Sequence, residues 1–211
     1  METKKIKINE NGFEYEFAVP PFPLEYEKWK KKQAQEYFDW FVEQVPVRAE
    51  YVLNKALTYY GYNPKSVTDP ETKLLLVWRW FLKFARLEET SAEEREANRP
   101  YVERFGKSWG VLYKLTPVTE FFIRDIGMLF GQLLYDELGT LTWGLMEKPK
   151  SSIDYNQVIL KGFVFTEFEP PFITSANPIH LVSVQATNIL DGTAKDTDLV
   201  EIYKIWRTKH E

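Results

Sequence analysis

Residues 74–82, which read Leu-Leu-Leu-Val-Trp-Arg-Trp-Phe-Leu, are apolar on almost every side when they are drawn as a helix. A helix of this kind has no polar face to turn toward water, so it has to lie inside the fold. Asp69 supplies an N-cap and Pro70 a favoured first helical residue, and the pattern predicts a helix from there to about Leu87. The rest of the chain therefore has to surround a central helix.

A second long apolar helix is predicted to begin at Thr116-Pro117 and to end near Leu138, before Gly139. Within it Gly127 and Gly131 are four residues apart and share one face. Glycine lowers helix stability, so two glycines on one face need a steric reason. We expect another helix or a sheet to pack closely against this face.

Five further helices are predicted from apolar spacing and from residues that start and stop helices. Pro46 divides the first two, because proline removes a helical hydrogen bond and clashes with the preceding turn, and the second of them is expected to bury Val47. Ser91 and Glu94 have the spacing of a capping box, and Pro100 interrupts the short charged helix that they begin. The five helices span about residues 24–44, 46–60, 91–99, 179–190 and 196–209.

Strand patterns flank the helical middle. Polar and apolar residues alternate in residues 5–8 and 13–17, with turn residues between them, and this predicts a β-hairpin. Further strands are predicted at about residues 108–115, 141–146 and 158–165. Residues 169–172, Glu-Pro-Pro-Phe, are expected to form a rigid loop.

The fold class that follows is α+β, with several helices packed against a small, mostly antiparallel sheet that the N-terminal hairpin helps to complete. We expect a single domain over residues 1–211. It would consist of an N-terminal β-hairpin, a helical middle, strands at about residues 141–165 and two C-terminal helices.

Composition narrows the possible partners. The 27 basic and 31 acidic side chains give a net charge of −4, which offers no field to attract a nucleic acid or an anionic membrane. Without cysteine the chain has no disulfide, no thiolate zinc site and no cysteine nucleophile. The N-terminus is charged and no apolar run reaches membrane-spanning length, so we expect a cytoplasmic protein.

No catalytic motif is present in the sequence. It has no Gly-x-Ser-x-Gly elbow, no phosphate loop and no dinucleotide fingerprint, and His180 and His210 do not have the spacing of metal ligands. Asp125 lies among apolar residues, and a buried acid can be catalytic, although Arg124, Arg79 or a tryptophan N–H would satisfy it structurally. We therefore expect no catalytic residue, cofactor or metal. An enzyme would need Asp125 and His180 to converge in one pocket.

Two acidic groups are the candidate partner-binding residues. The first group is a cluster of glutamates in and just before the predicted helix at residues 91–99, and we call it the acidic knob. If it binds no partner, its role is that of a solubilising surface. Asp136 and Glu137 lie near the C-terminus of their helix, where the dipole disfavours acids, and they are expected to turn outward toward a partner. The candidate partner-binding residues of the acidic knob are Glu88, Glu89, Glu93 and Glu94.

A pattern of packing residues resembles a group of uncharacterised bacterial proteins, some of them similar to immunity proteins of polymorphic toxin systems. In these proteins a glycine-bearing apolar helix leads into a Trp-containing strand and then a second strand. The resemblance covers roughly half the chain, contains no catalytic motif and implies a related fold. The residues that carry it are 37–41 with Pro46, Asp125-Ile126-Gly127, Gly131, Gly139, Trp143, Pro149 and Asp154-Tyr155-Asn156.

The favoured function is therefore a cytoplasmic immunity protein that neutralises a cognate toxin by direct binding, without catalysis. Exposed carboxylates steer such an inhibitor toward a basic nuclease, and a few aromatic residues supply most of the affinity. One alternative is a small enzyme with a carboxylate-based site. The other is a structural or assembly protein that forms a homodimer through an exposed aromatic patch.

Overall fold

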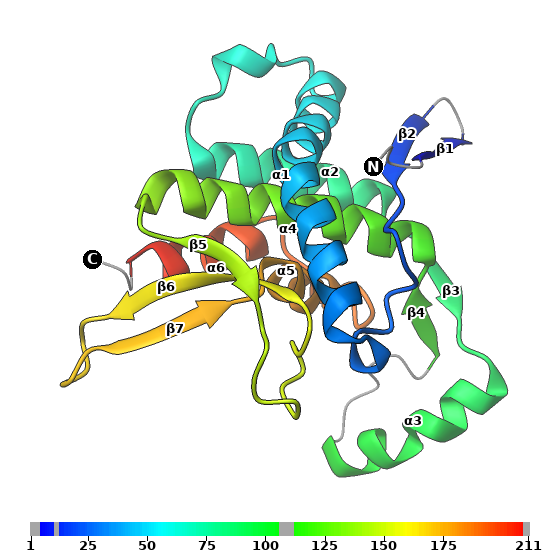
Figure 1. Cartoon of the computed structure of the whole chain (residues 1–211). Helices are drawn as coiled ribbons and strands as arrows, with labels where there is room; N and C mark the ends of the chain where they lie inside the picture. Colours follow the sequence, from blue (N-terminus) through cyan, green and yellow to red (C-terminus); the bar gives the residue numbers. More distant parts are fainter. Residues whose placement is uncertain (1–4, 11–12, 106–111, 209–211) are drawn as a thin grey trace. The chain divides into compact units, whose positions relative to one another are not determined.

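The computed structural model describes residues 5–10, 13–105 and 112–208 (Figure 1). Helices alternate with short antiparallel strands, so the predicted α+β class is confirmed. The helices are α1 (Lys31–Tyr59), α2 (Pro70–Phe84), α3 (Ala92–Phe105), α4 (Pro117–Leu138), α5 (Pro178–Thr187) and α6 (Asp198–Thr208), with short 3₁₀ helices at Tyr26–Lys28 and Pro64–Ser66.

The structure confirms the two helix starts for which the sequence showed capping residues, at Asp69 and at Ser91 with Glu94. Asp69 accepts a hydrogen bond from the backbone N–H of Thr72 at 2.8 Å, and this begins α2. At α3 the Ser91 N–H donates to the Glu94 carboxylate at 2.8 Å, and the Glu94 N–H donates to the Ser91 hydroxyl at 3.1 Å. These reciprocal bonds satisfy backbone donors that have no partner within the helix.

The strands of the described residues form separate antiparallel sheets, β1-β2, β3-β4 and β5-β6-β7. The prediction that the N-terminal hairpin completes one sheet with the later strands is therefore wrong. It failed because, among the described strands, β1 and β2 pair with each other and with no other strand, and sheet partners are not visible in local alternation. The strands are β1 (Lys5–Glu10), β2 (Phe13–Ala18), β3 (Leu87–Glu89), β4 (Tyr113–Leu115), β5 (Thr142–Leu145), β6 (Val158–Phe165) and β7 (Phe172–Ala176).

Two prolines lie inside helices, contrary to prediction. Helix α1 continues through Pro46, and α3 continues through Pro100. A proline in a helix interior costs about 3 kcal/mol. Beside Pro46 this cost is offset by burial, because Val45 and Ala49 are almost fully enclosed. Val47 is 56% exposed, so its predicted burial is also wrong.

Other differences lie at element boundaries. Helix α1 begins at Lys31 rather than near residue 24, and the predicted loop at residues 169–172 ends at Phe172, the first residue of β7. Strands β3 and β7 were not predicted. Of the predicted strand at 108–115, Tyr113–Leu115 forms β4, and residues 108–111 lie outside the described residues, as does Lys209.

Packing divides the chain into two compact units. Unit 1 comprises the described residues of Met1–Tyr51, Met128–Pro178 and Ile205–Glu211, and unit 2 comprises those of Val52–Gly127 and Ile179–Lys204. Helices α1, α4, α5 and α6 contribute residues to both units. The single domain over residues 1–211 stays a prediction.

In unit 1 the sheet β5-β6-β7 packs against α4 and α1 through aromatic residues. Gly131 of α4 leaves room for the indole of Trp143 and the ring of Pro178, which a Cβ at this position would meet. The ring of Trp143 also contacts Phe41 of α1, with centroids 5.6 Å apart. The predicted close packing at Gly131 is therefore confirmed.

In unit 2 helix α2 is central, as predicted. Trp78 and Trp80 are both fully buried; the first stacks on Phe81, and the second meets Phe122 of α4 edge to face. Gly127 of α4 packs directly on the backbone of α5. The buried residues of α2 are Leu74, Leu76, Val77, Trp78, Trp80 and Phe81.

Candidate functional site

The two candidate catalytic residues belong to different helices, Asp125 to α4 and His180 to α5. Asp125 is buried at 3% exposure. Gly127 faces Ile179 of α5, the neighbour of His180. Two residues turn an α-helix by about 200°, so Asp125 lies on the side of α4 that faces away from α5. The side chain of Asp125 is therefore directed away from the helix that carries His180.

The acidic knob is partly neutralised by neighbouring basic side chains. The Lys114 ammonium lies 2.6 Å from the Glu94 carboxylate and 3.5 Å from that of Glu88. The hydrogen bond from Lys114 lowers the pKa of Glu94, and the backbone N–H of Ser91 lowers it further. The same hydrogen bond raises the pKa of Lys114. Two of the four predicted carboxylates thus share one cation.

The remaining knob carboxylates differ from each other. Glu89 lies 3.7 Å from the guanidinium of Arg95, while Glu93 is exposed and forms no hydrogen bond or ion pair within the described residues. The four knob carboxylates thus face two cations, Lys114 and Arg95, and Glu93 is the one of the four that faces neither. This weakens the knob as a surface for a basic partner.

Asp136 and Glu137 were expected to turn outward, and both are exposed. Asp136 accepts a hydrogen bond from the Gln132 amide at 2.7 Å, and Glu137 lies 3.5 Å from the Arg207 guanidinium. These two residues belong to unit 1, whereas the knob belongs to unit 2. Each predicted group is therefore partly engaged by side chains of its own unit.

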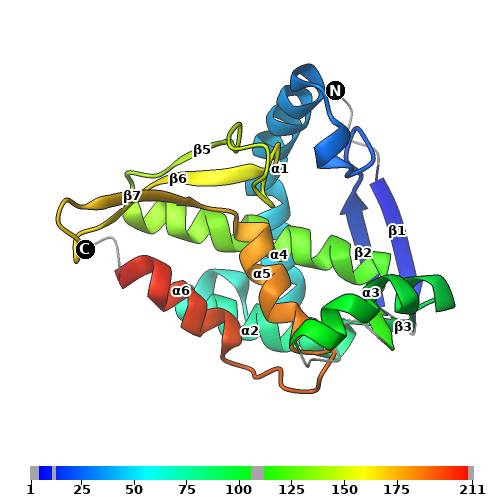
Figure 2. The same ribbon diagram turned by 90° about the horizontal axis from the view of Figure 1, so that it is seen from below.

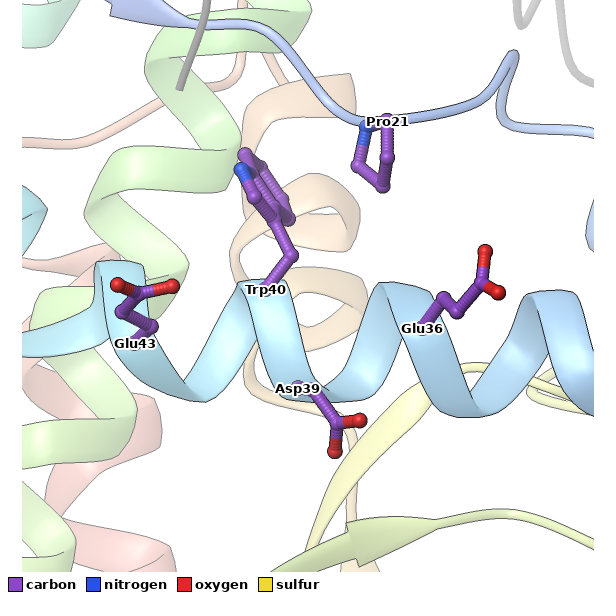
Figure 3. Close-up of a pocket in the computed structure, with 5 residues that line it drawn as sticks. All are labelled: Pro21, Glu36, Asp39, Trp40 and Glu43. Atoms are coloured by element: carbon purple, nitrogen blue, oxygen red, sulfur yellow. The ribbon is translucent and has the colours of Figure 1, made fainter. Parts of the chain in front are cut away.

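A different acidic surface, not recognised from the sequence, lies along α1. Glu36, Asp39 and Glu43 line a cavity of about 210 Å³ together with Pro21 and Trp40. Figure 3 shows Glu36 and Glu43 on either side of Trp40 along the helix, Pro21 facing the indole, and Asp39 pointing away from Pro21. We call this surface the α1 acidic face.

Helical spacing produces this face. Positions 36, 39, 40 and 43 follow the i, i+3, i+4, i+7 pattern that places side chains on one side of a helix. The same side continues with Val47, which is 56% exposed, and with Glu50, which is also exposed. The face therefore has four carboxylates along about four turns of helix.

Pro21 is held opposite α1 by anchors on both sides of it. Before it, the guanidinium of Arg48 donates to the Glu16 carbonyl at 2.5 Å and lies over the ring of Tyr51. After it, the Trp29 indole N–H donates to the Pro23 carbonyl at 3.0 Å. The segment that connects β2 to α1 is thus fixed as one wall of the cavity.

Charge compensation on the α1 acidic face is weak. Glu36 lies 3.6 Å from the Lys32 ammonium, a surface pair of the kind that contributes little free energy. Asp39 accepts a hydrogen bond from the uncharged Gln35 amide at 2.8 Å. Within the described residues, neither Glu43 nor Glu50 forms a hydrogen bond or ion pair. The face therefore retains a local excess of negative charge.

Trp40 gives this face an aromatic centre. Its residue is 8% exposed, and its indole N–H has no hydrogen-bond partner in the part of the chain that the structure describes. Its ring packs on Tyr37, with centroids 5.5 Å apart, so the indole is held rigidly. Tryptophan is one of the residues enriched at the energetic centres of protein interfaces.

The size and chemistry of the cavity favour a long basic side chain. Pockets for small molecules usually measure about 300–1,000 Å³, and this one is smaller. Carboxylates beside an aromatic ring bind the guanidinium of arginine or the ammonium of lysine. Within the described residues, no three histidine, cysteine, aspartate or glutamate side chains are grouped to hold a metal ion.

The function of this face has to be inferred from its chemistry. In residues 5–10, 13–105 and 112–208, no helix is both long enough and apolar enough to cross a membrane. No family model, no curated protein and no solved structure matches this chain.

Proposed function

We propose that this chain is a non-catalytic cytoplasmic immunity protein that neutralises a cognate bacterial toxin by binding it through the α1 acidic face. The partner is a basic protein, and the contact covers its basic surface. The observation that carries the proposal is the small cavity beside Trp40, lined by carboxylates of which Asp39 and Glu43 face no cation within the described residues.

Electrostatics explains why an acidic helix suits this role. Toxins that cleave nucleic acids present positive charge to their substrate, and an acidic surface of complementary shape is attracted to the same region. On α1 the exposed Glu43 and Glu50 steer the approach. The cavity beside Trp40 then accepts one arginine or lysine side chain, which is desolvated between the indole and the carboxylates.

The proposal predicts that Glu43→Lys weakens binding to the partner. The substitution reverses the charge at one wall of the cavity, so a basic side chain meets repulsion in place of attraction. The partner is obtained by co-expression with the protein encoded beside this gene. We expect the dissociation constant to rise about tenfold or more at low salt, with less suppression of toxicity.

Glu93→Lys is the matched control. Glu93 is also exposed, also lies on a helix and also has no partner within the described residues, so both variants change the net charge equally. We expect Glu93→Lys to bind almost as the wild type does. Equal weakening by both variants would show an effect of net charge alone and reject the α1 acidic face. A neighbouring protein that does not bind the wild type at all would reject the immunity role.

A further inference from the structure

The sheet β5-β6-β7 of unit 1 has one open edge that is unusually apolar. Strand β7 lies at the edge of the sheet in both views (Figures 1 and 2). Within the described residues, its backbone pairs only with that of β6. The N–H and C=O groups on the other side of β7 therefore form a template on which another strand can pair.

Strand β7 lacks the features that usually protect an edge. Its sequence, Phe-Ile-Thr-Ser-Ala, contains no charged residue and no proline. Phe172 is 55% exposed and Ile173 is 69% exposed. Natural edge strands are blocked by lysine, proline or inward-pointing charge, and an apolar edge without them is a site of strand pairing. Within the described residues, β5 at the opposite edge has no large exposed apolar side chain.

We propose that two copies of this chain form a homodimer by antiparallel pairing of β7 with β7 of the second copy. The pairing would join two three-stranded sheets into one sheet of six strands, a common size for a sheet. This contact is distant in sequence from the α1 acidic face and does not rest on the function proposed for it.

The sequence of β7 is complementary to itself in one register. When two copies pair antiparallel about Thr174, Phe172 of one copy lies opposite Ala176 of the other, and Ile173 lies opposite Ser175. Each large side chain thus meets a small one, and the two-fold axis makes each contact twice. This fit to an identical strand favours a second copy as the occupant.

Charge also favours the antiparallel dimer. The chain carries a net charge of −4, so an uncharged surface is favourable for contact between two copies. Strand β7 is uncharged, and Glu167 and Glu169 both precede its N-terminal end. Antiparallel pairing keeps these glutamates of the two copies at opposite ends of the contact. Parallel pairing would place them side by side, which is unfavourable.

Sedimentation equilibrium of the whole chain tests the proposal. A five-residue strand contact is small, so we expect a weak dimer whose fraction rises with protein concentration. Ile173→Lys adds a charge to each strand at the contact and is expected to raise the dimer dissociation constant about tenfold or more. A wild-type chain that stays monomeric at all concentrations would overturn the proposal.

Ile153→Lys is the matched control. Ile153 is 73% exposed, slightly more than Ile173, and lies between β5 and β6 rather than on β7. Both variants should keep the wild-type circular dichroism spectrum, because both side chains are mostly in solvent. Equal loss of dimer in the two variants would place the contact elsewhere than β7.

A cysteine variant locates the two-fold axis. The chain has no cysteine, so Thr174→Cys introduces a single thiol. At the axis the two Cα atoms of an antiparallel pair lie about 4.5–5.5 Å apart, within the range that a disulfide spans. We expect mild oxidation to convert Thr174→Cys, but not Ile153→Cys, into a covalent dimer. Equal cross-linking of the two variants would contradict the register.

Discussion

Trp78→Ala is expected to lower the free energy of unfolding by about 3–5 kcal/mol, the range measured when large buried aromatic residues are truncated. Trp78 is fully buried at the centre of α2 and stacks on Phe81, with centroids 4.9 Å apart. Its indole N–H donates to the Lys195 carbonyl at 2.9 Å, a contact that ties α2 to the segment before α6. Truncation would open a cavity and remove the donor to this carbonyl.

Urea unfolding of the variants separates these two losses. Trp78→Phe keeps most of the ring packing but removes the N–H, and we expect it to cost about 1–3 kcal/mol. A loss of less than about 1 kcal/mol in Trp78→Ala would show that Trp78 is not in a close-packed core.

Gly127→Ala is expected to destabilise the protein by about 1–3 kcal/mol, although alanine is the better helix former by up to about 1 kcal/mol. A Cβ at this position would lie 2.7 Å from the Cα of Ile179 and 2.8 Å from its Cγ1. The obstacle includes the backbone of α5, which cannot turn aside as a flexible side chain can. Relief of the clash requires α4 and α5 to separate, with loss of packing.

Gly61→Asn is the control for Gly127→Ala. Gly61 has a φ of +73°, and a Cβ added there would have no described atom within 4 Å beyond its chain neighbours. Asparagine adopts this left-handed conformation readily, so we expect an effect on thermal unfolding below about 1 kcal/mol. Stabilisation of the protein by Gly127→Ala would contradict the close packing of α4 against α5 at this position.

Local signals in the sequence predicted much of the fold. Helix α4 has the predicted bounds, Asp69 caps α2 as expected, and β6 spans the predicted residues. Each of these features depends on residues a few positions apart, such as a cap, a terminal glycine or an apolar run. The two glycines of α4 also predicted close packing, because their helix-breaking tendency needs a compensating contact.

The errors arose where distant contacts decide the structure. Burial around Pro46 outweighs the cost of a proline inside α1, and Pro100 likewise lies inside α3. Strand β3 pairs with β4 across more than twenty residues, which local alternation does not reveal. The separation of the hairpin β1-β2 from the other sheets is set by long-range pairing in the same way.

The candidate site was missed for a related reason. From the sequence the knob is the densest run of acids, but Lys114, twenty residues after Glu94, neutralises part of it only in three dimensions. The acids of α1 are spread over several turns, and Lys28, Lys30, Lys31 and Lys32 precede them in the sequence. The i, i+3, i+7 spacing of Glu36, Asp39 and Glu43 was the available signal.

The central claim is that a basic partner binds at the α1 acidic face, and zero-length carbodiimide cross-linking of the purified complex tests it most directly. This reagent joins carboxylates to lysines in contact, and mass spectrometry identifies the joined residues. We predict cross-links from Glu43 and Glu50 to lysines of the partner. Cross-links confined to Glu89 and Glu93 of the knob, with none on α1, would contradict this claim.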